Sequence, residues 1–414
     1  MNRDELERTV LAAVHETPVV DIHTHLYGPA FGELLRRGVD ELLTYHYLVA
    51  EFLRYRPELT PAEFWALPRA RQADAVWDAL FVQHTPLSES ARGVVTTLTA
   101  LGVEPGQRDL ERIRRRLGHC RVEDYIDRVF ALANVRSVVM TNDPLDPREG
   151  AVWQAGTLRD ARFRPALRLD GVLLDWPAGA RALSAQGFPA SEPFGANGQV
   201  AVRDFLGHWI GLMQPVYLAV SLPPTFNPHD GSPTARLLCE TVVPVALEHG
   251  LPLALMIGVR KGVNPALGDA GDGVGRADVA AVEELARAFP RLRLLVTMLS
   301  RENQHELCVA ARKFSNLLVF GCWWFLNSPS IIRELTAERL EWLGLTFIPQ
   351  HSDARVLDQL IYKWAHSRAV IGAVLAEKYQ DVAHAGWPVT AADIRRDVAR
   401  LMGGELLTGP SRAS

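Results

Sequence analysis

The sequence predicts an α/β protein built around a (β/α)8 barrel, and two observations support this. First, eight short apolar runs, rich in β-branched or aliphatic residues, recur along the 414 residues. Near-continuous apolarity indicates strands that are covered on both faces, as in a parallel sheet. Second, from the second run onward the intervening stretches, such as ADVAAVEELARAFP, carry helix-like patterns. Eight strands that alternate with helices are typical of this barrel.

The predicted strands follow one another along the whole chain. They occupy residues 18–26, 135–143, 162–170, 215–223, 251–259, 292–300, 316–324 and 345–353. After the last one, VLDQLIYKWAHSRAVIGAVLAEKY predicts the closing helix. The stretch between the first two strands is far longer than a barrel crossover requires, and its patterns are helical. We therefore predict a barrel formed by 1–26 and 135–414, with a helical insertion, 27–134, over its C-terminal mouth.

Composition and charge narrow the class of function. The chain is 48% hydrophobic, which is ample for a large core, and its formal net charge of −4 gives no argument for binding nucleic acid or an anionic membrane. Four cysteines lie far apart and are expected to be reduced thiols. No apolar run approaches the ~18 residues of a membrane helix, and the charged start MNRDELERTV is unlike a signal peptide. We expect a cytoplasmic homo-oligomer that binds a small molecule, and neither nucleic acid nor membrane.

Two histidines, His23 and His25, stand one residue apart at the end of the first strand, in VVDIHTHL. Strand side chains alternate between faces, so both imidazoles point to the same side. Alone, such a pair is more often two satisfied polar side chains than a metal site. Asp353 ends the eighth strand, which neighbours the first in a closed barrel. Two imidazoles and one carboxylate leave metal positions open for water or substrate, so we predict one divalent ion, Zn2+ by default and Mn2+ as an alternative.

Charged and aromatic side chains gather at other strand ends, where barrel active sites lie. Arg168, Arg301 and Arg355 follow three of the strands. They are either surface ion-pair partners or the binding site for an anionic substrate, because a guanidinium binds a carboxylate through two parallel hydrogen bonds. Trp323 and Trp324 end the seventh strand, and alternation lets at most one of them face the pocket. This clustering is the main indication of an enzyme.

The pair His46–Tyr47 lies soon after the first strand, in LTYHYLVAEF. Taken alone, such a pair in a helical segment is more often part of helix packing than of catalysis. Both readings stay open on the residues alone.

The order of these motifs resembles that of a known family. H-x-H on the first strand with a lone Asp on the eighth resembles the amidohydrolase superfamily, and the detailed match is to uronate isomerases (glucuronate/galacturonate ketol-isomerases). YHYLVAEFLRYR resembles that family's His-Tyr segment, MTNDPLD its T-x-D-P stretch, RLDG its R-P-D strand end and MIGVRKGVN its H-I-G-x-x-R-x-x-N segment. GCWWF and HSDAR resemble its W-W-F and D-S-R. The chain is identified as a divergent member, because Met256 replaces a histidine and Val49–Ala50 a Trp-Arg pair.

The resemblance implies aldose–ketose isomerisation of a hexuronate or related sugar acid, by proton transfer between C1 and C2 through an enediol-like intermediate. General acid–base groups must then move both C–H and O–H protons. The metal ligands would be His23, His25 and Asp353, and Asp353 would also be a proton carrier. The groups around the reacting end of the sugar would be Arg355, His46 and Tyr47, and the substrate contacts Arg168, Arg301 and one of Trp323 and Trp324.

Two other functions remain open at this point. One is a mononuclear metal-dependent hydrolase of the same superfamily, in which water attacks an ester, lactone or amide of an acidic substrate. The other is a non-catalytic barrel that binds a sugar acid. The arginine-rich rim favours the isomerase, whereas the missing strand-five histidine leaves room for the hydrolase.

Overall fold

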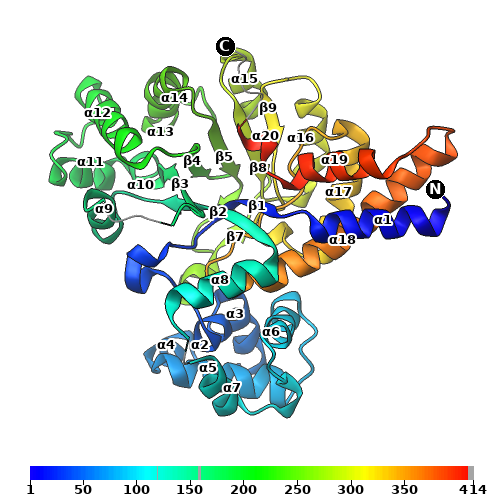
Figure 1. Cartoon of the computed structure of the whole chain (residues 1–414). Helices are drawn as coiled ribbons and strands as arrows, with labels where there is room; N and C mark the ends of the chain where they lie inside the picture. The colour runs from blue at the N-terminus through cyan, green and yellow to red at the C-terminus, as the bar shows by residue number, and fades with distance from the viewer. Residues whose placement is uncertain (119, 157–159, 409–414) are drawn as a thin grey trace.

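The computed structural model describes residues 1–118, 120–156 and 160–408, and its centre is a curled parallel sheet of seven strands (Figure 1). The strands are hydrogen-bonded in the order β1-β2-β3-β4-β5-β8-β9, and every neighbouring pair is parallel. Each of them lies inside one of the predicted runs. Their bounds are β1 Val19–Thr24, β2 Val135–Asn142, β3 Phe163–Arg168, β4 Leu218–Leu222, β5 Leu253–Ile257, β8 Leu294–Met298 and β9 Leu317–Val319.

A small antiparallel hairpin follows β5. It pairs β6, Val259–Arg260, with β7, Gly273–Val274, and its tip contains the 3-10 turn Pro265–Gly271.

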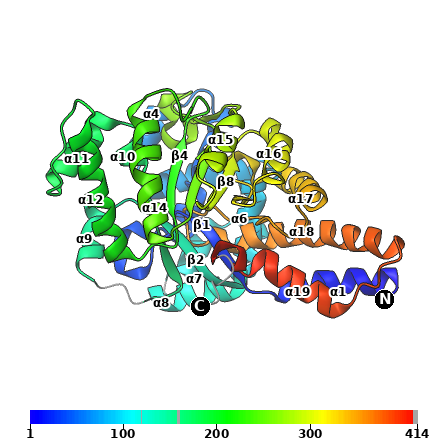
Figure 2. The same cartoon turned by 90° about the horizontal axis from the view of Figure 1, so that it is seen from above.

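Helices precede, connect and follow the strands. Helix α1 (Arg3–Glu16) leads into β1. Between β1 and β2 lie α2 Val39–Leu43, α3 His46–Tyr55, α4 Pro61–Ala66, α5 Arg69–Trp77, α6 Glu89–Ala100, α7 Leu110–Leu117 and α8 Val122–Ala133. The later helices are α9 Pro147–Gln154, α10 Asp170–Leu173, α11 Trp176–Ala185, α12 Ala196–Met213, α13 Pro233–Leu237, α14 Val243–His249, α15 Ala280–Ala288, α16 Gln304–Ala311, α17 Pro329–Leu343, α18 Gln359–His384, α19 Ala391–Met402 and α20 Glu405–Thr408. Helices α1, α18 and α19 project together from one side of the sheet (Figure 2).

Both faces of the sheet are buried, which is why its strands read as continuous apolar runs. In β5, Leu253, Leu255 and Ile257 point to the large cluster between sheet and helices, whereas Ala254 and Met256 point to a second cluster inside the curl of the sheet. The polar site described below lies at the end of that inner cluster, where the strands terminate.

The eighth predicted strand is only partly formed, and here the structure differs from the prediction. Residues 345–353 form no regular strand. A parallel bridge joins Phe320 to Ile348, and backbone bonds run from Asp353 N to His23 O (3.1 Å) and from His25 N to Ala354 O (2.8 Å). The segment therefore touches β9 on one side and β1 on the other. Pro349 offers no N–H to a ladder, and side chains take over the bonding, as where Ser352 N donates to Asp21 Oδ1 (3.0 Å). The sheet is thus compatible with a barrel.

The segment between β1 and β2 is helical in its described part, but it is not uniform in its contacts. Helix α8 packs against β2 and α18, at the outer layer of the sheet. Helices α3 and α4 instead contact the tip of the β6–β7 hairpin. Helix α4 begins at Pro61 because Thr60 and Glu63 form a capping box and a proline is favoured in the first turn. The division into a barrel and a separate insertion, 27–134, stays a prediction.

Two smaller expectations can be compared with the structure. In the described part of the chain, no helix combines the length and apolarity needed to cross a membrane. All four cysteines are unpaired in the structure.

Candidate metal centre and active site

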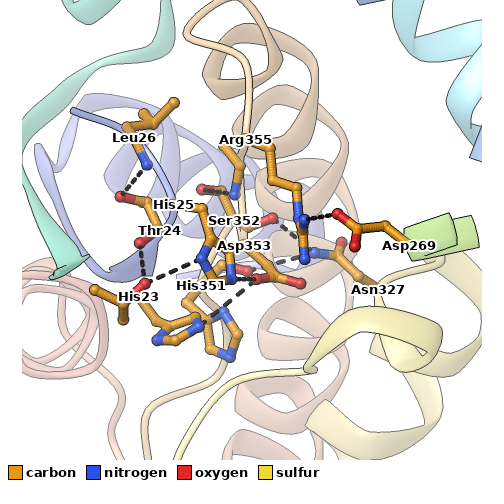
Figure 3. Close-up of polar contacts among 12 residues, drawn as sticks. His23, Thr24, His25, Leu26, Asp269, Asn327, His351, Ser352, Asp353 and Arg355 are labelled. Atoms are coloured by element: carbon orange, nitrogen blue, oxygen red, sulfur yellow. Dashed lines mark hydrogen bonds and ion pairs between the residues drawn. The ribbon is translucent and has the colours of Figure 1, made fainter. Parts of the chain in front are cut away.

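The end of β1 and the segment beside it bring three predicted metal ligands together. Asp353 Oδ1 lies 3.3 Å from His25 Nε2 and 3.6 Å from His23 Nε2, and one potential ligand atom from each residue lies within 4.8 Å of the others. The backbone bonds between His23, His25 and residues 353–354 fix this approach. Asp353 adopts a left-handed backbone conformation (φ 52°), which turns its carboxylate toward the imidazoles. Figure 3 shows the three side chains pointing toward one another, with His351 beside His23.

Hydrogen bonds orient both imidazoles with Nε2 toward Asp353. The Thr141 hydroxyl donates to Thr24 O (2.9 Å), so its oxygen is free to accept from His25 Nδ1, 3.1 Å away. The Tyr217 hydroxyl likewise donates to Ile22 O (2.7 Å) and lies 3.4 Å from His23 Nδ1. Each ring then carries its proton on Nδ1, and Nε2 has a free lone pair. Such partners of the second ring nitrogen are characteristic of metal-ligating histidines.

The donor set fits a divalent cation. His23 Nε2 and Asp353 Oδ1 are buried and have no hydrogen-bond partner among the described residues. Buried polar atoms without partners are costly, and a cation between them removes that cost. Two nitrogens and one carboxylate oxygen suit zinc.

The protonation states also suit metal binding. Burial lowers the pKa of His25, and lowers that of His23 well below its ordinary value, so both rings are neutral at pH 7. Burial raises the pKa of Asp353, but its close contacts with His25, His23 and His351 outweigh burial, and the pKa lies below its usual range. Neutral imidazoles and an ionised carboxylate are the forms that bind a metal ion.

A cavity opens directly on this cluster, at the C-terminal end of the strands. Besides the three candidate ligands, its wall contains Thr141, Arg168, Asp170, Ser221, Met256, Lys261, Trp323, Trp324 and Arg355. The three cations of this wall are each paired with an aspartate. Arg168 contacts Asp170 (2.7 Å), Lys261 contacts Asp272 (2.7 Å) and Arg355 contacts Asp269 (2.6 Å).

Both tryptophans line the cavity, so the prediction that at most one of them faces the pocket is wrong. The reason is that β9 ends at Val319 and the alternation of side chains ends with it. Trp324 begins a 3-10 turn with a positive φ of 46°, which places its ring beside that of Trp323, with a centroid distance of 6.1 Å.

His46 and Tyr47 are consecutive at the start of α3 but lie in different surroundings. His46 shares a second cavity with Arg355, and its ring centroid is 6.1 Å from that of Trp324. Its Nε2 is buried and has no hydrogen-bond partner within the described part of the chain, and burial is the main cause that lowers the pKa of His46 to about 3. Tyr47 stacks on Phe325 (6.3 Å) and packs against the inner apolar cluster, and burial raises its pKa well above the ordinary value.

Arg301 does not reach the cavity. It begins a 3-10 turn after β8, its side chain is 56% exposed, and its guanidinium pairs with Glu334 on α17 (2.8 Å). Its position fits a surface ion pair, the alternative that the sequence left open, rather than a substrate contact.

Several residues of the site were missed at the level of sequence. Tyr217 and Asp269 carry no local signal, because each acts on a residue far away in the chain. Thr141 lies in the T-x-D-P stretch, but its contact with His25 was not predicted. Lys261 could have been found, since it stands at the arginine position of the H-I-G-x-x-R-x-x-N pattern. His351 is fully buried, and neither of its ring nitrogens has a partner among the described residues.

Comparison with solved structures decides the family. Over 98% of its length the chain matches a uronate isomerase from Bacillus halodurans, with 50% sequence identity, a TM-score of 0.96 and 97% of that chain covered. The chain belongs to the uronate isomerase family. The hydrolase alternative is therefore not favoured. Neither a scan against protein-family models nor a search of curated proteins returns a match.

Two more distant uronate isomerase structures share the fold. The uronate isomerase of Thermotoga maritima matches with 15% identity and a TM-score of 0.80, over 99% of both chains. The glucuronate isomerase of Caulobacter crescentus matches with 17% identity and a TM-score of 0.68, over 100% of this chain and 95% of that one. At such identities the likeness speaks for the fold alone.

Proposed function

We propose that this member of the uronate isomerase family is a metal-dependent aldose–ketose isomerase of a hexuronate or a related sugar acid. The observation that carries the proposal is the cluster of His23, His25 and Asp353 facing a cavity whose wall contains Arg168 and Arg355. A metal-binding set beside two guanidinium groups suits a substrate that has a carbonyl at one end and a carboxylate at the other.

The cation would be one divalent ion, zinc by preference and manganese as the alternative, held by His23, His25 and Asp353. When bound there, it would polarise the carbonyl oxygen of the substrate and make the proton on the neighbouring carbon more acidic.

The other groups bind the sugar or move its protons. Arg168 or Arg355 would bind the carboxylate through two parallel hydrogen bonds. Asp353 is an ionised carboxylate at the reacting end and would carry the proton between C2 and C1. Neutral His46 would transfer protons to and from the hydroxyl groups of the sugar, and Tyr47 would assist it. The indoles of Trp323 and Trp324 would cover the substrate and exclude water.

We also infer the architecture that surrounds the site. Residues 347–354 take the place of an eighth strand, because they are bonded to both edges of the sheet, and they would close it into a (β/α)8 barrel. The helices within 27–134 would cover the mouth of this barrel, as the hydrogen bond from Trp65 Nε1 to Ala266 O (3.2 Å) suggests.

The test is direct. Purified protein is assayed for metal by elemental analysis and then incubated with D-glucuronate, D-galacturonate and a panel of other sugar acids, with products followed by NMR. We expect about one divalent ion per chain, a ketose from at least one uronate, and loss of both in His23→Ala. Metal-free protein with full activity would overturn the metal dependence. Cleavage products without a ketose would overturn the isomerase.

A further inference from the structure

Arg355 stands between two cavities. It lines both the cavity at the metal cluster and the neighbouring one that contains His46 and Trp65. Its backbone is fixed, because its N–H donates to Gln359 Oε1 at the start of α18 (2.8 Å). Its side chain is long and flexible, and within the described ranges its one hydrogen-bond partner is Asp269, which accepts from Nη1 (2.6 Å; Figure 3).

Asp269 comes from the tip of the β6–β7 hairpin, which is fixed at its base. There Asn264 N donates to Gly271 O (2.9 Å), and Asp272 accepts from Gly262 N (2.9 Å) and from Lys261 Nζ (2.7 Å). A Cβ on Gly271 would lie 1.8 Å from Asn264 O, so this turn requires glycine.

The tip itself is fixed from the other side. Trp65 on α4 donates to Ala266 O three residues before Asp269 (3.2 Å). Gly268, directly before Asp269, has a φ of 57°, a conformation that other residues rarely adopt. The carboxylate is therefore held in place although its side chain is 67% exposed.

The charge on Asp269 is maintained at neutral pH. Burial raises the pKa of Asp269, but the positive charges of Arg355 and Lys261 outweigh burial and hold the pKa below its ordinary value. Its single bond to Nη1 leaves the other N–H donors of the guanidinium free.

We propose that Asp269 is a positioning residue that holds one edge of the Arg355 guanidinium, so that the remaining donors face the sugar acid. This inference rests on the proposed function, because it assigns the free donors to the anionic group of that substrate. Without Asp269 the side chain of Arg355 would sample several rotamers, and binding would have to restrict it first.

The test is a double-mutant cycle on the full, metal-loaded chain. The probe is L-gulonate, the open-chain alcohol formed by reducing the aldehyde of D-glucuronate, which cannot isomerise. Its Kd is measured calorimetrically for wild type, Asp269→Ala, Arg355→Gln and the double variant. Glu248→Ala is the matched control. It removes an exposed ion pair of the same length (2.6 Å), which joins Glu248 on α14 to Arg203 on α12 and lies outside both cavities.

We expect Asp269→Ala to weaken binding about tenfold, the scale of one charge-assisted hydrogen bond at a partly exposed site. Asp269→Glu should restore most of the lost affinity, and Glu248→Ala should leave the Kd unchanged. The double variant should bind no more weakly than Arg355→Gln alone. An unchanged Kd in Asp269→Ala, or an equal loss in the Arg355→Gln background, would overturn the inference.

A second readout separates this inference from the proposed function. Crystal structures of wild type and Asp269→Ala should show the guanidinium displaced or in several positions in the variant. If it keeps its place, the inference is wrong, whatever the enzyme does. If wild type neither binds L-gulonate nor converts a uronate, the proposed function fails, while a displaced guanidinium would still support the positioning by Asp269.

Discussion

At the scale of single residues, the site depends on which nitrogen of each histidine carries its proton. His23 and His25 present Nε2 to Asp353 because Tyr217 and Thr141 occupy the two Nδ1 atoms. The H-x-H spacing predicted that the two rings would face one way, and the structure brings them together with Asp353. The orienting hydroxyls were beyond prediction, since β2 and β4 approach β1 only in the folded chain.

Replacing Thr141 by valine tests this orientation. The variant keeps the shape of the side chain but loses the oxygen beside His25 Nδ1, and we expect the metal to bind about tenfold more weakly. Metal affinity is measured by competition with a chromogenic chelator. Thr297→Val is the matched control, because Thr297 is also buried on a strand and its hydroxyl has no partner among the described residues. Equal metal affinity in both variants would contradict the assigned tautomers.

At the scale of elements, the segment after β9 shows what apolar runs can and cannot predict. Residues 345–353 read as a strand because they are buried, and they do lie between β9 and β1. These residues form no regular ladder of backbone hydrogen bonds. Pro349 has no N–H to donate, and side chains replace backbone acceptors, as where Cys322 N donates to Gln350 Oε1 (2.9 Å). The same departure from regular geometry explains the wrong expectation for Trp323 and Trp324. Burial could be predicted from the sequence, whereas local backbone conformation could not.

The contact between β9 and this segment depends on Gly321. Its φ is 66°, and a Cβ there would lie 1.9 Å from Cδ2 of His351. Gly344 also has a positive φ (59°), but no atom lies within 4 Å of its Cβ position. Both alanine variants share the backbone strain of ~1–3 kcal/mol. We expect Gly321→Ala to be less stable than Gly344→Ala by a further ~2 kcal/mol, from the clash. Melting temperatures provide the comparison, and equal values would show that His351 moves aside freely.

Glu149 on α9 links the ends of β1 and β2, and it titrates. It accepts from Tyr27 Oη (2.7 Å), Asn142 Nδ2 (2.9 Å) and Asp143 N (3.0 Å). Burial, opposed by these bonds, raises its pKa from 4.5 to about 6. Between these values the folded state binds a proton that the unfolded state lacks. The contribution of Glu149 to the free energy of unfolding therefore rises as the pH falls from about 7 to 4.5, by ~2 kcal/mol.

Glu149→Gln removes this titration. Denaturant unfolding at pH 7.5 and pH 4.5 should show wild type gaining stability relative to the variant at the lower pH. A constant difference between the two proteins would show that the carboxyl group of Glu149 keeps its ordinary pKa.

At the scale of the whole molecule, the order of elements could be predicted and their closure could not. Seven of the eight predicted runs are strands of one parallel sheet, because burial on both faces leaves a clear apolar pattern. The pairing of Arg301 with Glu334 at the surface could not be predicted, since it depends on where α17 packs. The fold brings the ends of β1, β3 and the eighth segment to one rim. There the cluster of His23, His25 and Asp353 and the guanidinium groups of Arg168 and Arg355 line the same cavity.

The central claim is that this rim converts an aldose into a ketose. Metal-loaded protein is incubated in D2O with D-glucuronate or D-galacturonate carrying 13C at C1, and the 13C spectrum is followed. We predict that the labelled aldehyde and hemiacetal signals give way to the hydroxymethyl signal of a ketose, split by deuterium to the extent that solvent reaches the proton carrier. A label that stays in an aldose, or that appears only in cleavage products, would contradict the account.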